Sequence, residues 1–178
     1  MMRKLKVEEL NRISVEEFKA TEKMPLVLVL DNVRSQNNVG SVFRTSDAFL
    51  VQKIFLCGIT STPPNADIHK TALGAEYSVD WEYVSSTAEV VRRLKEEGYF
   101  VFAVEQVENS LKLPDFEPES DGKYAVVFGN EVKGVQQEVV DLCDASLEIP
   151  QYGTKHSLNV SITAGIVIWD FFCKKRMA

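Results

Sequence analysis

The stretch PLVLVLD, residues 25–31, is the clearest indication of the fold in this sequence. Its centre is continuously apolar, with no alternation between apolar and polar side chains. Such a run is typical of a parallel strand that is covered on both faces. Similar short runs recur along the chain and predict further strands: KIFLCG (53–58), VDWEYV (79–84), YFVFAVE (99–105), YAVVFG (124–129) and SLEIP (146–150).

The segments between these runs carry helical patterns. Apolar residues recur at helical spacing in four of them: 38–50, 66–74, 86–98 and 135–143. A last helix is expected from near Asn159 to the basic end of the chain, and SVEEFKATE forms an early one, with Ser14 and Glu17 as a capping box. Alternating strands and helices predict an α/β fold, a mainly parallel sheet flanked by helices. We expect one domain over 1–178, with a helical extension over 1–24 before a core over 25–178.

Composition narrows the class of protein. The 178 residues are 45% hydrophobic and 26% charged, as in globular domains. No apolar run approaches the ~20 residues of a membrane span, and the first residues lack the apolar core of a signal peptide. Cys57, Cys143 and Cys173 form no C-x-x-C pair, and the histidines are not at ligand spacing. We therefore expect a cytoplasmic protein with buried free thiols, no metal site and no membrane contact.

Charge is unevenly distributed along the chain. The net charge of −6 argues against a diffuse electrostatic grip on nucleic acid. Basic residues nevertheless cluster at both ends: Arg3, Lys4, Lys6, Lys174, Lys175 and Arg176. Each cluster is interpreted as a solvated terminus, with the alternative that the two form one patch if the ends meet in a dimer.

Three loops that follow predicted strands are rich in polar side chains and glycine. They are DNVRSQNNVG after the first strand, GNEVKG after the fifth and PQYGTKHSLN after the last. Loops at the carboxyl ends of parallel strands carry function in such sheets. Neither G-x-G-x-x-G nor G-x-x-x-x-G-K-[ST] occurs in them, so both standard nucleotide-binding motifs are excluded.

The first loop leads into a helix that contains an arginine. Asn38 is expected to be the N-cap of this helix, because its side-chain oxygen can accept from the free amides of the first turn. Arg44 points away from the apolar face, either into solvent or into a site. Gly40 lies on the same side of the helix as Arg44. A glycine costs a helix roughly 1 kcal/mol relative to alanine, and its presence here favours close approach of another group.

Taken together, the three loops resemble a known family. They contain N-x-G-x-x-x-R at 38–44, G-x-E-x-x-G at 129–134 and I-P-x-x-G-x-x-x-S-L-N-V-S at 149–161. These segments resemble, in order and spacing, the three motifs of the SpoU/TrmH family of RNA ribose 2′-O-methyltransferases, within the SPOUT class. The resemblance covers about residues 25–172.

The resemblance implies a fold feature and an assembly. Members of the class tie their C-terminal region into a deep trefoil knot, which holds S-adenosyl-L-methionine between the second and third motifs. They are homodimers whose active site is completed near the subunit interface. Here the last helix, with Ile166, Trp169 and Phe172, is expected at that interface, although Trp169 is as well explained as a core residue of one chain.

The resemblance also implies roles for individual residues. The matching catalytic positions are Arg44, Asn38, Glu131, Ser157 and Asn159, and the matching cofactor positions are Gly129, Ile149 and Leu158. Arg44 is either the base that removes the hydroxyl proton or, more in keeping with a guanidinium group that normally only donates hydrogen bonds, a clamp for phosphate and developing charge. Asn38, Ser157 and Asn159 are equally suited to helix capping, and Glu131 to a solvated surface.

The expected function is transfer of a methyl group from S-adenosyl-L-methionine to a ribose 2′-hydroxyl of tRNA or rRNA. The alternative is a non-catalytic RNA-binding or ribosome-assembly factor that retains the SPOUT fold. Loss of Arg44, Asn38 or Asn159 would favour that alternative, and all three are present. Lys155 and His156 are open between RNA contact and a solvated loop.

Overall fold

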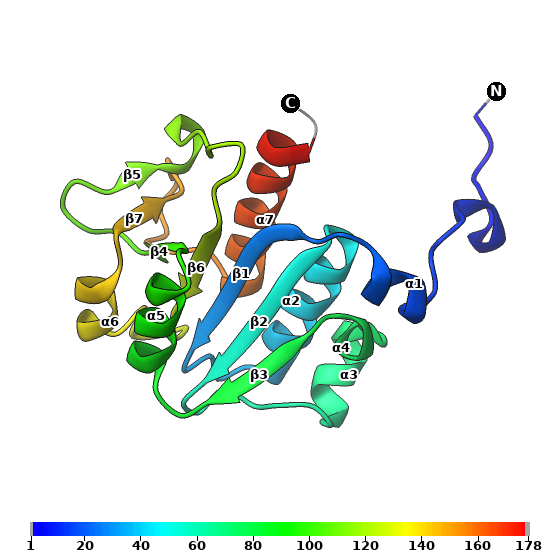
Figure 1. The fold of residues 1–178 in the computed structure, drawn as a ribbon, viewed down its shortest axis with the longest axis horizontal. Helices are drawn as coiled ribbons and strands as arrows, with labels where there is room; N and C mark the ends of the chain where they lie inside the picture. The colour runs from blue at the N-terminus through cyan, green and yellow to red at the C-terminus, as the bar shows by residue number, and fades with distance from the viewer. Residues whose placement is uncertain (1, 177–178) are drawn as a thin grey trace.

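The chain is built around one seven-stranded sheet. Figure 1 shows the arrangement of its strands and the surrounding helices. The structure, a computed structural model, describes residues 2–176, with Arg176 lacking a described side chain. The strands are β1 (Met24–Asp31), β2 (Val51–Cys57), β3 (Trp81–Val84), β4 (Phe100–Val104), β5 (Leu111–Lys112), β6 (Tyr124–Phe128) and β7 (Ala145–Glu148). Their order is β3-β2-β1-β6-β4-β7-β5, and every strand pairing is parallel. The predicted parallel α/β fold is therefore confirmed.

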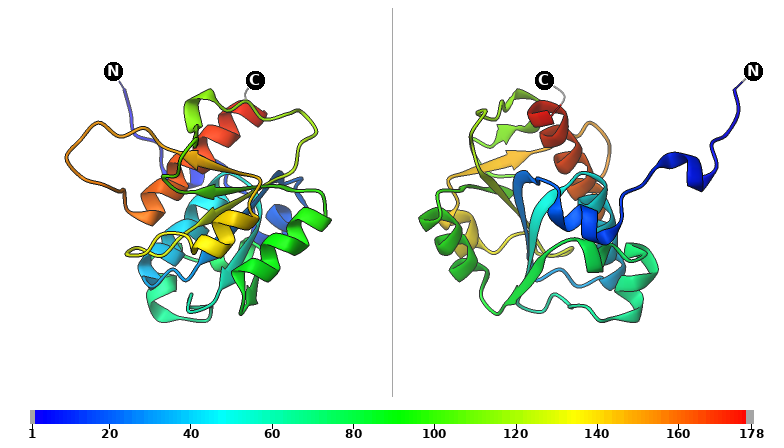
Figure 2. Two further views of the ribbon diagram at one scale, coloured as in Figure 1. Left: turned by 90° about the vertical axis from the view of Figure 1, so that its left-hand side faces the viewer. Right: turned by 45° about the vertical axis from the view of Figure 1, so that its right-hand side comes forward.

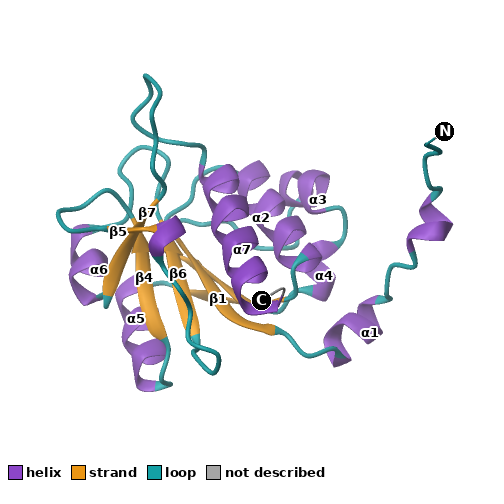
Figure 3. Ribbon diagram, turned by 90° about the horizontal axis from the view of Figure 1, so that it is seen from above, coloured by secondary structure: helices purple, strands orange, loops and turns teal. Residues whose placement is uncertain are grey.

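Helices cover both faces of this sheet. They are α1 (Val15–Ala20), α2 (Gln36–Ala48), α3 (Ala66–Ala72), α4 (Ala75–Ser78), α5 (Thr87–Glu96), α6 (Gln137–Leu142) and α7 (Val160–Arg176), with 3-10 turns at Val7–Leu10 and Leu113–Asp115. Figure 3 shows α5 and α6 on one side of the sheet, with α2, α3, α4 and α7 on the other.

Strand β1 lies between these two helical layers. Leu26, Leu28 and Leu30 point into the core beneath α2 and α7, whereas Val27 and Val29 point into the core beneath α5 and α6. All five are at most 2% exposed. Because both faces are buried, the strand has no polar position to alternate with, which explains the unbroken apolar run.

Helix α2 begins earlier than expected. Its N-cap is Ser35, whose Oγ accepts a hydrogen bond from the Asn38 amide at 3.3 Å, so the expectation that Asn38 is the cap is wrong. Ser35 and Asn38 are both capping residue types, and the sequence alone does not separate them. The carboxylate of Glu131 accepts from the amides of Arg34 and Ser35, which fixes the chain just before the helix. The side chain of Asn38 is thereby left available for other contacts.

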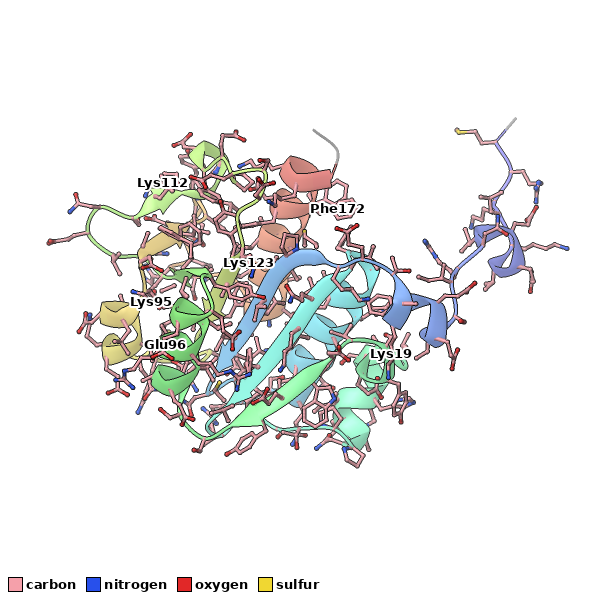
Figure 4. The ribbon with its side chains drawn as sticks, in the orientation of Figure 1. Lys19, Lys95, Glu96, Lys112, Lys123 and Phe172 are labelled. Carbon is pink, nitrogen blue, oxygen red and sulfur yellow. The ribbon has the colours of Figure 1, made fainter. Side chains whose placement is uncertain are left out.

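The N-terminal residues form an arm. The capping box of α1 is confirmed: the Glu17 amide donates to Ser14 Oγ at 3.1 Å, and the Ser14 amide donates to Glu17 Oε2 at 2.7 Å. Phe18 is buried and joins this helix to the core. The preceding residues, 2–13, extend away from the body, as the stick view shows (Figure 4).

The basic cluster at the other end has a structural role. Lys174 Nζ donates to the carbonyl oxygens of Leu113 and Phe116, at 3.0 and 2.6 Å. Lys175 Nζ donates to the carbonyls of Glu119 and Ser120, at 2.7 and 2.6 Å. These two lysines hold the connection between β4 and β6, so the interpretation as a solvated terminus is wrong for them.

That connection is polar in sequence but is ordered by strand pairing and by buried side chains. It contains β5, which pairs with β7, and Lys112 on β5 (labelled in Figure 4) forms an ion pair with Glu148 at 2.5 Å. Leu113 is buried, and Phe116 packs against the core. A two-residue strand is too short to leave a pattern in the sequence, which is why β5 was not predicted.

Three further observations concern expectations from composition. Cys57 is buried, and burial raises the pKa of its thiol to about 12. Cys143 and Cys173 are half-buried free thiols. In residues 2–176 no helix is long and apolar enough to cross a membrane, and no three side chains of His, Cys, Asp or Glu gather in a group suited to a metal ion.

Candidate active site

The candidate site is a cavity at the carboxyl edge of the sheet. It measures about 620 Å³, within the range of small-molecule sites. Its walls come from the segments that follow β4, β6 and β7, including residues of the second and third motifs. The segment after β7 projects from the body as a long loop, drawn in orange in Figure 2, before it turns back into α7.

Three side chains, one from each motif, form a hydrogen-bonded chain at this cavity. Asn38 Nδ2 donates to Glu131 Oε1 at 3.1 Å. Asn159 Nδ2 donates to Asn38 Oδ1 at 3.2 Å. Asn38 thus donates at one end of its amide and accepts at the other, and it links residues that are far apart in the sequence. Three of the expected catalytic residues are thereby brought together.

Glu131 is held in its ionised form. Burial opposes ionisation of its carboxylate, but hydrogen bonds from the amides of Arg34 and Ser35 and from Asn38 outweigh burial and lower the pKa of Glu131. The two main-chain bonds are 2.9 Å long each. The carboxylate is exposed to solvent, but these hydrogen bonds fix its position beside Asn38.

Asn159 has two roles at once. Its Oδ1 accepts from the Ser161 amide at 2.8 Å, which caps α7, while its Nδ2 binds Asn38. The helix-capping interpretation therefore applies to this residue, and its expected catalytic role stays a prediction. Ser157 lines the cavity, and no hydrogen bond joins it to Asn38, Glu131 or Asn159 in the structure.

The second motif needs its two glycines for close backbone contact. A Cβ on Gly129 would overlap the main chain of Gly134 and Val135. Gly134 has a φ of +68°, which disfavours other residues, and its amide and carbonyl pair with those of Asn130 at 2.9 and 3.0 Å. Gly129 lines the cavity, as do Ile149 and Leu158, the other two expected cofactor residues.

Arg44 lies elsewhere. It is on the exposed face of α2 and is not among the residues that line the cavity of its own chain. Gly40 does not make room for it either. A Cβ on Gly40 would collide with the carbonyl oxygen of Ile68 and the hydroxyl of Thr71, so this glycine permits close packing of α2 on α3.

Two carboxylates in or near the cavity were not among the expected residues. Asp31, at the end of β1, is fully buried and accepts from Thr87 Oγ1 at 2.6 Å and from the Gln136 amide at 3.0 Å, so it ties α5 to the end of the second motif. Glu105, just after β4, lines the cavity. Each ends an apolar run with a charged residue, and that was the signal available in the sequence.

Comparison with known proteins identifies the family. The model of the SpoU rRNA Methylase family matches residues 25–169. This chain belongs to the SpoU rRNA methylase family. The resemblance drawn from the three motifs is confirmed, and so is the SPOUT class of the fold.

A relative from the SpoU family is the 23S rRNA (guanosine-2′-O-)-methyltransferase RlmB of Vibrio parahaemolyticus. It is 32% identical over 163 residues, which cover 91% of this chain and 64% of the relative. The chain thus spans slightly less than two thirds of that protein.

Solved structures of the SpoU family have the same fold. The A. aeolicus TrmH/SpoU tRNA modifying enzyme matches with a TM-score of 0.78 and 25% identity, over 90% of this chain and 79% of that chain. The AdoMet-bound rRNA methyltransferase of Sinorhizobium meliloti matches with a TM-score of 0.77 and 25% identity, over 86% and 59%.

Proposed function

We propose that this chain transfers a methyl group from S-adenosyl-L-methionine to a ribose 2′-hydroxyl of tRNA or rRNA, in the cytoplasm. The observation that carries the proposal is the hydrogen-bonded chain of Glu131, Asn38 and Asn159 beside the cavity. It places fixed donors and acceptors from all three motifs around one point, which is the arrangement needed to orient a hydroxyl group for in-line attack.

The cavity suits the cofactor. S-adenosyl-L-methionine, when bound, supplies an electrophilic methyl group. The close packing of the main chain at Gly129 and Gly134 brings the backbone of the second motif to the cavity wall, and Ile149 and Leu158 offer apolar contact. We infer that the second and third motifs, which line one cavity, form the trefoil knot of the class.

The RNA is expected to approach over the mouth of this cavity. The protein has a small group of cations in this region. Arg34 and Lys155 are exposed on the first and third loops, and Lys133 lines the cavity. Phosphate groups are gripped by such side chains, and a few well-placed cations suffice to fix an orientation. A local group of this kind is compatible with a net charge of −6.

We further propose that the chain acts as a homodimer. The outward face of α7 is apolar, with Ile162, Ile166 and Trp169 exposed by 57%, 37% and 48%. Gly165 lies among them with open space around it, which leaves room for close approach of another helix. An exposed apolar strip of this kind favours a protein interface. Because Arg44 is exposed and does not line the cavity of its own chain, we place it at the site that a partner subunit completes.

Single-turnover transfer of labelled methyl groups to bulk tRNA and rRNA tests the function. Arg44→Ala should abolish transfer and leave cofactor affinity, measured by calorimetry, nearly unchanged. Arg92→Ala is the matched control, because Arg92 is exposed on α5, on the opposite face of the sheet. A wild-type protein that binds cofactor and RNA without methyl transfer would favour a non-catalytic RNA-binding or assembly factor instead. Equal rates for wild type and Arg44→Ala would contradict the role of Arg44.

A further inference from the structure

Glu105 is a carboxylate in the cavity that none of the three motifs includes. It follows β4, whose neighbours in the sheet are β6 and β7, so it lies between the strands that lead into the second and third motifs. It lines the cavity together with Gly129, Ile149 and Leu158. Its position is therefore that of a residue that contacts the bound cofactor.

The structure holds Glu105 firmly by both main chain and side chain. Its amide donates to the Leu147 carbonyl at 3.2 Å, and its own carbonyl accepts from Ser146 Oγ at 2.8 Å. Its Oε1 accepts from the Gln106 amide at 3.0 Å, and its Oε2 accepts from the Val135 amide at 3.1 Å. A carboxylate fixed at both oxygens in this way is oriented before any ligand arrives.

This carboxylate still has capacity to accept hydrogen bonds. Its two oxygens provide about four acceptor positions, and the two amides occupy two of them. Another glutamate of the cavity, Glu148, forms an ion pair with Lys112. No lysine or arginine in residues 2–176 forms an ion pair with Glu105.

We propose that Glu105 binds the neighbouring 2′- and 3′-hydroxyl groups of the adenosyl ribose of the cofactor. The proposal rests on the function proposed above. A carboxylate with two free acceptor positions matches two adjacent hydroxyl donors. An acidic residue that binds a ribose hydroxyl is also a recurring solution at the carboxyl edge of parallel sheets in dinucleotide-binding domains.

A role as counter-charge for the sulfonium group is the competing assignment. The two amide bonds already compensate much of the charge on Glu105, which reduces its attraction for a cation but leaves its outer acceptor positions intact. The two assignments differ in a measurable way, because S-adenosylhomocysteine has the same ribose as S-adenosyl-L-methionine but lacks the sulfonium charge.

Calorimetry on the full chain separates these assignments. The ligands are S-adenosyl-L-methionine, S-adenosylhomocysteine, and two analogues of the latter that each lack one ribose hydroxyl. We expect Glu105→Gln to weaken the first two ligands by the same factor, about tenfold. The variant should also lose most of the preference that the wild type shows for the intact ribose. Glu108→Gln is the control: it removes the same charge from an exposed residue that does not line the cavity.

Each other outcome overturns the inference in a recognisable way. If Glu105→Gln weakens the intact and the deoxy ligands equally, Glu105 only holds the loop at Val135. A larger loss for S-adenosyl-L-methionine than for S-adenosylhomocysteine assigns Glu105 to the positive charge. Failure of the wild type to bind either compound would overturn the proposed function as well, and is thereby distinguished from failure of Glu105 alone. Thermal melting of each variant shows whether the fold is retained.

Discussion

Asn38 uses both ends of its amide, donating to Glu131 and accepting from Asn159. Asn38→Asp preserves the size of the side chain and the bond to Asn159. It also places a second carboxylate next to that of Glu131. We expect it to lose nearly all methyl transfer at neutral pH and to melt at a lower temperature than Asn38→Ala, because like charges at this distance repel. Transfer assays and thermal melting of both variants check this. An aspartate variant as active as wild type would refute the arrangement.

The pKa of Glu131 predicts how stability depends on pH. Its hydrogen bonds lower the pKa in the folded protein below that in the unfolded chain, about 4.3. Ionised Glu131 therefore stabilises the fold above that value, and this contribution is lost as the pH falls through the lower folded value. The difference in unfolding free energy between wild type and Glu131→Gln should be greatest near pH 7 and shrink below about pH 4. Urea unfolding across this range measures it, and a constant difference would contradict the prediction.

At the scale of elements, Gly40 sets how closely α2 and α3 approach. Alanine favours a helix over glycine by about 1 kcal/mol, so propensity alone predicts that Gly40→Ala stabilises the protein. The collision of the new Cβ with the carbonyl of Ile68 predicts the opposite, a loss of about 1–3 kcal/mol. Gly153→Ala is the control, because nothing lies within 4 Å of its Cβ position. Chemical unfolding decides between the two, and a stabilised Gly40→Ala would show that the helices move apart at little cost.

The end of α7 and the connection between β4 and β6 stabilise each other. Lys174→Gln removes charged hydrogen bonds to the carbonyls of Leu113 and Phe116, and should lower the unfolding free energy by about 1–3 kcal/mol. RNA affinity should not change. Lys155→Gln, in an exposed loop beside the cavity, should show the reverse, weaker RNA binding with unchanged stability. Filter binding measures the RNA affinity of both variants, and urea unfolding measures their stability. Loss of RNA binding by the Lys174 variant would instead favour the interpretation of the C-terminal lysines as a solvated basic patch.

The elements that the sequence predicts well are those with a local cause. Buried parallel strands such as β1 need continuous apolar runs, and the capping box of Ser14 and Glu17 is complete within four residues. The features missed have distant causes. The start of α2 depends on Glu131, and the role of Lys174 depends on carbonyls some sixty positions away. The motifs predict the site residues, but only the fold shows that Asn38 is hydrogen-bonded to the other two loops and that Arg44 lies on the exposed face of α2.

At the scale of the whole molecule, the outward strip of α7 predicts the oligomeric state. Ile166→Glu places a charge in the middle of this strip and should convert the proposed dimer into a monomer at micromolar concentration. Methyl transfer should fall with it, because Arg44 then has no partner site to complete. Ile59→Glu is the control, since Ile59 is 65% exposed in a different part of the surface. Light scattering measures the mass, and a wild-type monomer would contradict the dimer outright.

The hydrogen bond between Asn38 and Asn159 joins residues 121 positions apart, and β1 pairs directly with β6 across nearly a hundred. Such contacts form slowly, because a long loop must close before they contribute. During synthesis, β1 therefore has no β6 to pair with until the later part of the chain has been made. The site forms only after Asn159 has left the ribosome. A partly made chain consequently has no assembled pocket, and its β1 edge is open to wrong pairing until β6 arrives.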